Sequence, residues 1–211
     1  MRDYNQEYFY LVSSGLGDYP LLDYAPNGGN YNEIFRPKPV DTGEKRILRF
    51  SPPIPSKPQF GDYHYLAVHA PVISERLKKV LEALNIEEVQ FLPTVILDKT
   101  DNEHEGYYIL HTYKEIRCLD KAKSKWEKGD FDEESTSEID KLVLDNEILD
   151  TIPLEKRLMF GLWENRTYLV FHQSVIEKIL EISPTGIRVY PISEYDDSLP
   201  FIDTYKEYFG K

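Results

Sequence analysis

Proline placement constrains this sequence more than any other feature, because proline fixes φ and supplies no backbone hydrogen-bond donor. Eight of the 14 prolines lie within residues 1–60, at Pro20, Pro26, Pro37, Pro39, Pro52, Pro53, Pro55 and Pro58. They exclude long helices from this segment and favour extended or turning backbone, with predicted strands at residues 7–12 and 46–50. We therefore expect residues 1–60 to form a proline- and tyrosine-rich arm that packs on the main body and contributes an edge strand or two.

Residues 61–211 show the periodicities of an α+β domain. Apolar side chains at helical spacing predict a helix from 73 to 84, and a second helix is expected at 174–182. Apolar runs predict a hairpin at residues 158–171 and further strands at 63–68, 89–97, 107–111, 116–119, 141–144 and 186–191. The expected fold class is therefore α+β, with mixed or antiparallel sheets and a few helices.

Two segments of this domain, residues 63–97 and 166–192, resemble one another at an offset of 103 residues. In each, a strand ends in a histidine, His69 or His172, and is followed by an amphipathic helix and a second strand. A strand–helix–strand unit cannot cover its own apolar face, so two such units are expected to pack together as a pseudo-repeat. Chance similarity between two common units is the alternative.

The charge of the chain is strongly negative, at −12, with 25 basic and 37 acidic residues. The excess lies in residues 61–211, because residues 1–60 carry equal numbers of each sign. Such a surface repels phosphate backbones and anionic lipid, which argues against nucleic acid or membrane as partners. An acidic surface that only maintains solubility is the alternative. No long apolar run or export signal is visible, and the single cysteine fits a cytoplasmic location.

Catalytic and cofactor motifs are missing from the sequence. Gly15 and Gly17 run into Pro20 and not into a helix, so no phosphate-binding loop is expected there. Cys118 lies in an apolar run with no residue that would mark it as a nucleophile, so packing is its expected role. We therefore predict no catalytic, cofactor-binding or metal-binding residues.

The histidine pair provides the one enzyme hypothesis. His69 and His172 occupy equivalent positions in the two similar segments, and two imidazoles facing one cleft can bind a metal or move protons. The alternative function is thus a small hydrolase with a His69/His172 cleft. The structural interpretation is that each imidazole bonds to backbone amides or carboxylates where its helix begins.

Acidic residues gather in three places: one at 98–105, one at 127–140 and one in the C-terminal tail from Glu194 to Asp203. No calcium-loop spacing is present in them. The segment 127–140 is either solvated surface or a docking patch for a basic partner. Within it, the predicted partner-binding residues are Asp130, Asp132, Glu133 and Glu134.

Five short motifs follow one another between residues 63 and 191. They are Val72-Ile73-Ser74-Glu75-Arg76-Leu77, Leu92-Pro93-Thr94-Val95, Asp120 with Ser124, Leu142-Val143-Leu144-Asp145, and Thr185-Gly186-Ile187-Arg188-Val189-Tyr190-Pro191. In this order they resemble immunity family eleven of bacterial polymorphic toxin systems, formerly a domain of unknown function and typified by the Myxococcus self-recognition immunity protein. Phe171-His172-Gln173-Ser174 departs from that family's usual pattern, and residues 1–60 show no pattern that matches.

The resemblance implies an immunity protein in the cytoplasm that binds and neutralises a cognate toxin by protein–protein interaction. It implies no catalysis and no cofactor. For the motif pair Asp120 and Ser124 we expect a structural role, in which Asp120 caps a short helix at residues 121–126 and Ser124 closes a turn. A role in binding is the alternative for this pair.

Overall fold

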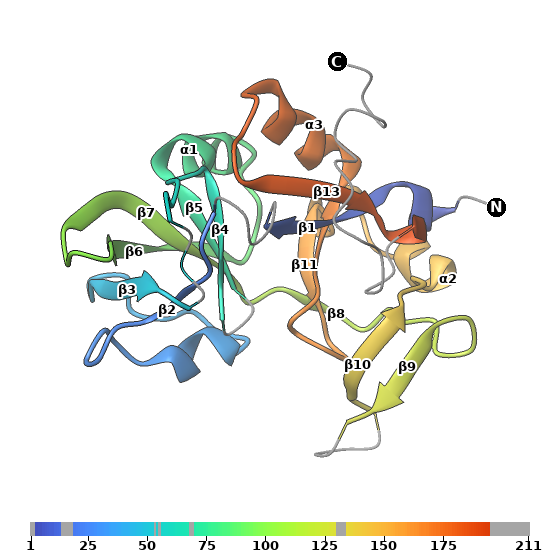
Figure 1. The fold of residues 1–211 in the computed structure, drawn as a ribbon. Helices are drawn as coiled ribbons and strands as arrows, with labels where there is room; N and C mark the ends of the chain where they lie inside the picture. The colour runs from blue at the N-terminus through green and yellow to red at the C-terminus, as the bar shows by residue number, and fades with distance from the viewer. Residues whose placement is uncertain are drawn as a thin grey trace. The chain divides into compact units, whose positions relative to one another are not determined.

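The computed structural model describes residues 3–13, 19–52, 54, 56–67, 70–129 and 134–194. These residues form an α+β fold in two compact units (Figure 1). The barrel unit takes its described residues from 12–113 and 178–187, and the sheet unit takes them from 3–11, 114–177 and 188–194. The α+β class predicted from the sequence is confirmed.

Six strands close into a barrel in the order β2 (Leu22–Tyr24), β3 (Arg46–Phe50), β6 (Val89–Leu97), β7 (Glu103–Thr112), β5 (Ala70–Ser74) and β4 (Tyr63–Leu66). β3 lies parallel to β6, β6 pairs with β7 along most of its length, and Leu22 opposite Leu66 closes the ring. The interior is filled by fully buried side chains, namely Leu22, Leu48, Leu66, Val72, Leu92, Ile96 and Ile109. The barrel is therefore a packed core and not a channel.

The proline-rich segment between β2 and β3 contains the short 3₁₀ helix η2 (Tyr31–Phe35) and is held to the barrel by Arg46. The Arg46 side chain is fully buried and donates to the carbonyl oxygens of Glu44 and Asp41 at 2.7 and 2.9 Å. It also pairs with the Glu33 carboxylate at 3.1 Å. One guanidinium thus anchors three points of a segment that has little regular structure of its own.

The β4–β5 hairpin was not predicted. The sequence indicated one strand at 63–68 followed by a helix that included Ile73, but Ile73 lies in β5, opposite Tyr63 of β4. Helix α1 (Glu75–Ala83) starts only after Ser74, which caps it by accepting a hydrogen bond from the Leu77 amide. The apolar run 70–73 fits both a helical and a strand periodicity. It forms a strand because its backbone pairs with β4 and β7.

The sheet unit contains a five-stranded sheet in the order β13 (Ile187–Pro191), β1 (Tyr8–Ser13), β12 (Leu169–His172), β11 (Met159–Leu162) and β8 (Glu115–Ile116). The predicted hairpin of β11 and β12 is confirmed by their antiparallel register. The edge position expected for the strands of residues 1–60 is wrong, because β1 lies between β12 and β13 and because β2 and β3 belong to the closed barrel. Burial of four consecutive residues, Tyr8 to Leu11, agrees with this internal position.

A separate two-stranded sheet, β9 (Lys125–Lys128) with β10 (Thr136–Lys141), completes the strands of the sheet unit. The remaining helical elements are α2 (Asn146–Asp150), α3 (Gln173–Glu181), and the 3₁₀ turns η1 (Tyr4–Gln6), η3 (Leu154–Lys156) and η4 (Ile192–Glu194). The predicted strand at 141–144 is wrong beyond Lys141, since Leu144 forms only an isolated bridge with Leu119.

The two similar segments contain β4, β5, α1 and β6 at residues 63–97, and β12, α3 and β13 at residues 166–192. The first therefore has one strand more than the second. Their relation as a pseudo-repeat, and the division of the chain into an arm at 1–60 and a domain at 61–211, stay predictions.

We expect Gly186→Ala to lower the free energy of unfolding by on the order of 2–3 kcal/mol. Gly186 has a φ of +79°, and an added Cβ would lie 2.5 Å from the Tyr63 carbonyl oxygen. Gly106 is the matched control, because its φ is +82° but nothing lies within 4 Å of the position of a Cβ. Chemical denaturation of both variants measures the difference, and equal losses would show that the contact with Tyr63 contributes nothing.

Candidate partner-binding surface

Asp62, the residue before β4, accepts hydrogen bonds from two other parts of the barrel unit. Ser74 Oγ donates to Asp62 Oδ1 at 2.7 Å, and Thr185 donates to Oδ2 through its amide and its hydroxyl, at 2.8 and 3.0 Å. The Arg76 guanidinium adds a two-pronged ion pair with the same carboxylate. We call Asp62, Ser74, Arg76 and Thr185 the Asp62 cluster.

The cluster fixes the ionisation of its central carboxyl. Burial alone would raise the pKa of Asp62, but the hydrogen bonds from Arg76, Thr185 and Ser74 outweigh it and lower the pKa to about 2. The carboxylate is only 8% exposed, whereas the Arg76 side chain is 53% exposed. Ser74 and Thr185 belong to two of the five sequence motifs, so these motifs converge on one structural carboxylate.

The motif residues in the sheet unit also form hydrogen bonds within the fold. Asp120 accepts hydrogen bonds from the amides of Ala122 and Lys123, both at 3.2 Å, and Ser124 Oγ bonds to both backbone groups of Val143. Asp145 caps α2. The helix expected at 121–126 is wrong, because a turn at 121–123 leads directly into β9. The structural role predicted for Asp120 and Ser124 is nevertheless the one that these bonds describe.

Two histidines of the barrel unit, His64 and His111, are buried and bonded to backbone groups. His64 Nε2 accepts a hydrogen bond from the Gly61 amide, and burial lowers the pKa of His64 to about 4. His111 lies 3.0 Å from the Lys38 carbonyl oxygen, and burial lowers its pKa as well. Both rings are therefore neutral at pH 7 and engaged with backbone groups.

His172, half of the proposed hydrolase pair, lies where α3 begins. Its Nδ1 accepts from the Ser174 amide at 3.1 Å, and its Nε2 is 3.6 Å from the Glu7 carboxylate. These are the backbone and carboxylate partners expected under the structural interpretation. His69 lies outside the described residues, so the shared cleft of the hydrolase hypothesis is not tested.

The predicted partner-binding loop is described in part. Asp130, Asp132 and Glu133 lie outside the described residues, and Glu134 is exposed. The Glu134 carboxylate pairs with Arg117 at 2.8 Å, and the Arg117 guanidinium also lies over the Trp163 ring at 4.6 Å. Part of the charge of Glu134 is thus compensated within the chain.

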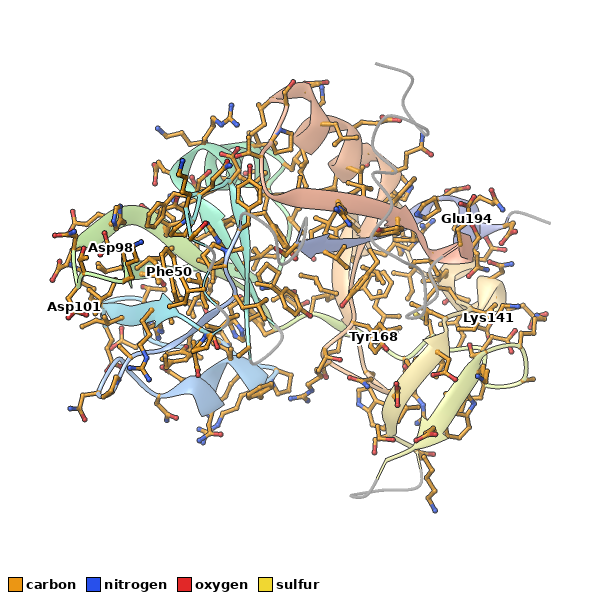
Figure 2. All side chains as sticks on the ribbon, in the orientation of Figure 1. Phe50, Asp98, Asp101, Lys141, Tyr168 and Glu194 are labelled. Carbon is orange, nitrogen blue, oxygen red and sulfur yellow. The ribbon has the colours of Figure 1, made fainter. Side chains whose placement is uncertain are left out.

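The acidic segment 98–105 is a structured turn between β6 and β7. Asp98 accepts from the amide and hydroxyl of Thr100, both at 2.7 Å, and from His104 at 3.1 Å; these bonds hold the pKa of Asp98 well below its usual range. Asp101 lies at the same turn (Figure 2). Its φ of +62° is in the left-handed region. Among the tail acids, Glu194 ends η4, and Asp196, Asp197 and Asp203 lie outside the described residues.

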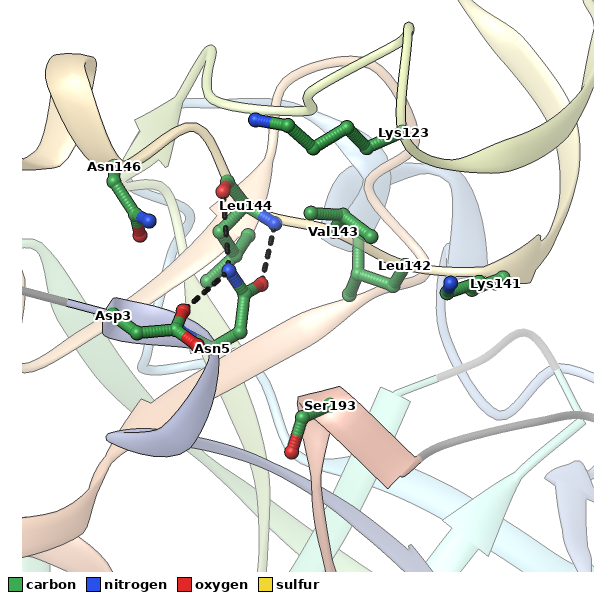
Figure 3. Close-up of a pocket in the computed structure, with 9 residues that line it drawn as sticks. All are labelled: Asp3, Asn5, Lys123, Lys141, Leu142, Val143, Leu144, Asn146 and Ser193. Carbon is green, nitrogen blue, oxygen red and sulfur yellow. Dashed lines mark hydrogen bonds between the residues drawn. The ribbon is translucent and has the colours of Figure 1, made fainter.

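A pocket of about 600 Å³ opens in the sheet unit beside the base of β10 (Figure 3). It is lined by Asp3, Asn5, Lys123, Lys141, Leu142, Val143, Leu144, Asn146 and Ser193. The Asn5 side chain crosses it, accepting from the Leu144 amide at 2.7 Å and donating to Asp3 at 3.0 Å. Lys123 is paired with Asp120 at 2.6 Å. Most of the polar groups that line the pocket are therefore bonded to other residues of the chain.

Within the described part of the chain, no three His, Cys, Asp or Glu side chains are grouped to hold a metal ion. Cys118 is fully buried, and burial raises the pKa of its thiol. None of the helices in the described ranges has the length and apolar character needed to cross a membrane.

A comparison with protein families gives the class of the molecule. The model of the immunity protein family Imm11 matches residues 23–188, which is most of the chain. The chain belongs to this immunity protein family. The match begins within β2, in the predicted arm of residues 1–60, where the sequence shows no motif of the family. No curated protein matches the chain.

We expect Asp62→Asn to lower the free energy of unfolding by about 2 kcal/mol at pH 7, the value that corresponds to the lowered pKa. The folded-state pKa lies below the unfolded one, so this stability is present above pH of about 4 and is lost as the pH falls toward 2. Denaturant titrations of both proteins from pH 7 downward should show the difference shrinking in that window. Glu87→Gln, at an exposed position, is the control; a difference independent of pH would contradict the assignment.

Proposed function

We propose that this protein binds and neutralises a cognate bacterial toxin by protein–protein interaction in the cytoplasm, without catalysis. Membership of the Imm11 family over residues 23–188 is the observation that carries the proposal. The motif residues support it indirectly. Ser74, Thr185 and Asp120 have their side chains engaged in caps and turns, so recognition falls to other, exposed parts of the surface.

The charge of the protein indicates what kind of toxin surface fits. A net charge of −12 favours association with a basic protein and disfavours nucleic acid or anionic membrane as partners. We propose that the loop acids Asp130, Asp132, Glu133 and Glu134 contact the toxin. An immunity protein must bind before its toxin acts, so attraction at long range has a direct benefit.

The function itself is tested by co-purification and rescue. The tagged chain is purified from its native host, and the protein that accompanies it is expressed in a susceptible bacterium, alone and with the chain. We expect growth arrest by the partner alone and recovery when the chain is co-expressed, with a stable complex of the two proteins. A partner that is harmless, or whose toxicity the chain does not relieve, would refute the proposal.

Replacing the four loop acids by lysine should slow association with that toxin by about tenfold at low salt and flatten its salt dependence. Stability should change by less than about 1 kcal/mol, because exposed ion pairs such as Glu134 with Arg117 contribute little. Stopped-flow association is the measurement. The control replaces four exposed acids of the barrel unit, Glu87, Asp101, Glu103 and Glu105, by lysine. Equal slowing in both proteins would show that only net charge matters.

A further inference from the structure

The register of the β9–β10 hairpin places like charges opposite one another. Glu127 of β9 faces Glu138 of β10, and all four residues of the two charged pairs, Glu127 with Glu138 and Lys125 with Lys141, are exposed. The intervening pair, Trp126 opposite Ile139, points to the other side, where Ile139 is fully buried. Alternation along β9 therefore gives the hairpin a charged outer face and an apolar inner face.

Among the described residues, one of these pairs has a counter-charge and the other has none. Lys125 is paired with the Asp140 carboxylate at 2.5 Å. For Glu127 and Glu138 the described residues supply neither an ion pair nor a side-chain hydrogen bond. Like charges directly opposite in a sheet are destabilising, so this pair costs stability that an opposite-charge or neutral pair would avoid. A like-charge pair that costs stability is typical of a position with a use outside folding.

The hairpin also presents this face from a fixed position within the sheet unit. The Tyr168 hydroxyl donates to the Ile139 carbonyl oxygen at 3.0 Å and accepts from the Ile139 amide at 3.3 Å. Asn165 Nδ2 donates to the carbonyl oxygens of Thr136 and Ser137 at 3.2 and 3.3 Å, and Trp126 Nε1 donates to Lys121 at 3.1 Å. These bonds hold the backbone of β10 and the inner face, which lowers the entropy lost when the outer face binds.

We propose that the outer face of the β9–β10 hairpin docks the cognate toxin, with Glu127 and Glu138 receiving a basic group of the toxin between them. This inference rests on the proposed function and places recognition on the strands as well as on the loop. Two adjacent carboxylates that pair with no cation among the described residues complement an arginine or a pair of lysines, which would remove the repulsion on binding. Glu134 contributes less, because Arg117 already compensates it.

The test compares two variants of equal net charge. One is Glu127→Gln with Glu138→Gln, and the control is Glu87→Gln with Asp101→Asn, two exposed acids of the barrel unit. The probe is the toxin recovered in the co-purification, inactivated by substitution in its own active site. We expect the hairpin variant to associate about three- to tenfold more slowly at low salt and the control less than about twofold more slowly. Equal rates for the two variants would overturn the proposal.

A stability measurement gives a second readout that needs no toxin. Glu138→Lys converts the repulsive pair into an attractive one, so its denaturation midpoint should rise above that of the wild type, while association with the toxin slows. A midpoint that falls, together with unchanged association, would overturn the proposal. The wild-type chain tests the proposed function separately. If the wild-type chain binds no toxic partner, the proposed function is refuted. If it binds one and the hairpin variants bind equally well, only the docking face is refuted.

Discussion

A single buried carboxylate, Asp62, joins parts of the barrel unit that are far apart in the sequence. Thr185 follows it by 123 residues, yet donates to it twice, and Ser74 and Arg76 bring the start of α1 to the same group. Without this anion, two hydroxyls, an amide and a guanidinium would lose a charged acceptor. The returning segment 178–187 is therefore tied to the barrel by the ionised state of one side chain.

The same cluster explains why the sequence motifs identify the family but not the binding surface. Ser74 caps α1, and Thr185 and Gly186 shape a tight return against β4. In the sheet unit, Asp120 binds the amides of a turn and Asp145 caps the start of α2. Such positions tolerate few residue types, because each depends on one hydrogen bond or one backbone angle. Binding to a partner needs other residues, and the exposed charges of the hairpin offer them.

Local pattern was sufficient for the helix α1, the long strands β6 and β7 and the hairpin of β11 and β12, since each has a clear periodicity or turn. It was insufficient for β5, where the run 70–73 suits both a helix and a strand until β4 and β7 are present. The internal position of β1 depends on strand order, which no local pattern encodes. No local pattern indicates Asp62, because its partners are distant in sequence. The pairing of Glu127 with Glu138 depends on the strand register, which β-bulges shift.

We propose that the motif residues maintain the fold whereas the hairpin binds the toxin. Hydrogen–deuterium exchange of the chain, free and in complex with inactivated toxin, tests it most directly at short labelling times. We expect new protection of backbone amides in residues 125–141, with amides around the Asp62 cluster, at 61–77 and 183–187, unchanged. Protection that appears around the Asp62 cluster and leaves the hairpin unchanged would show that the toxin binds the motif residues instead.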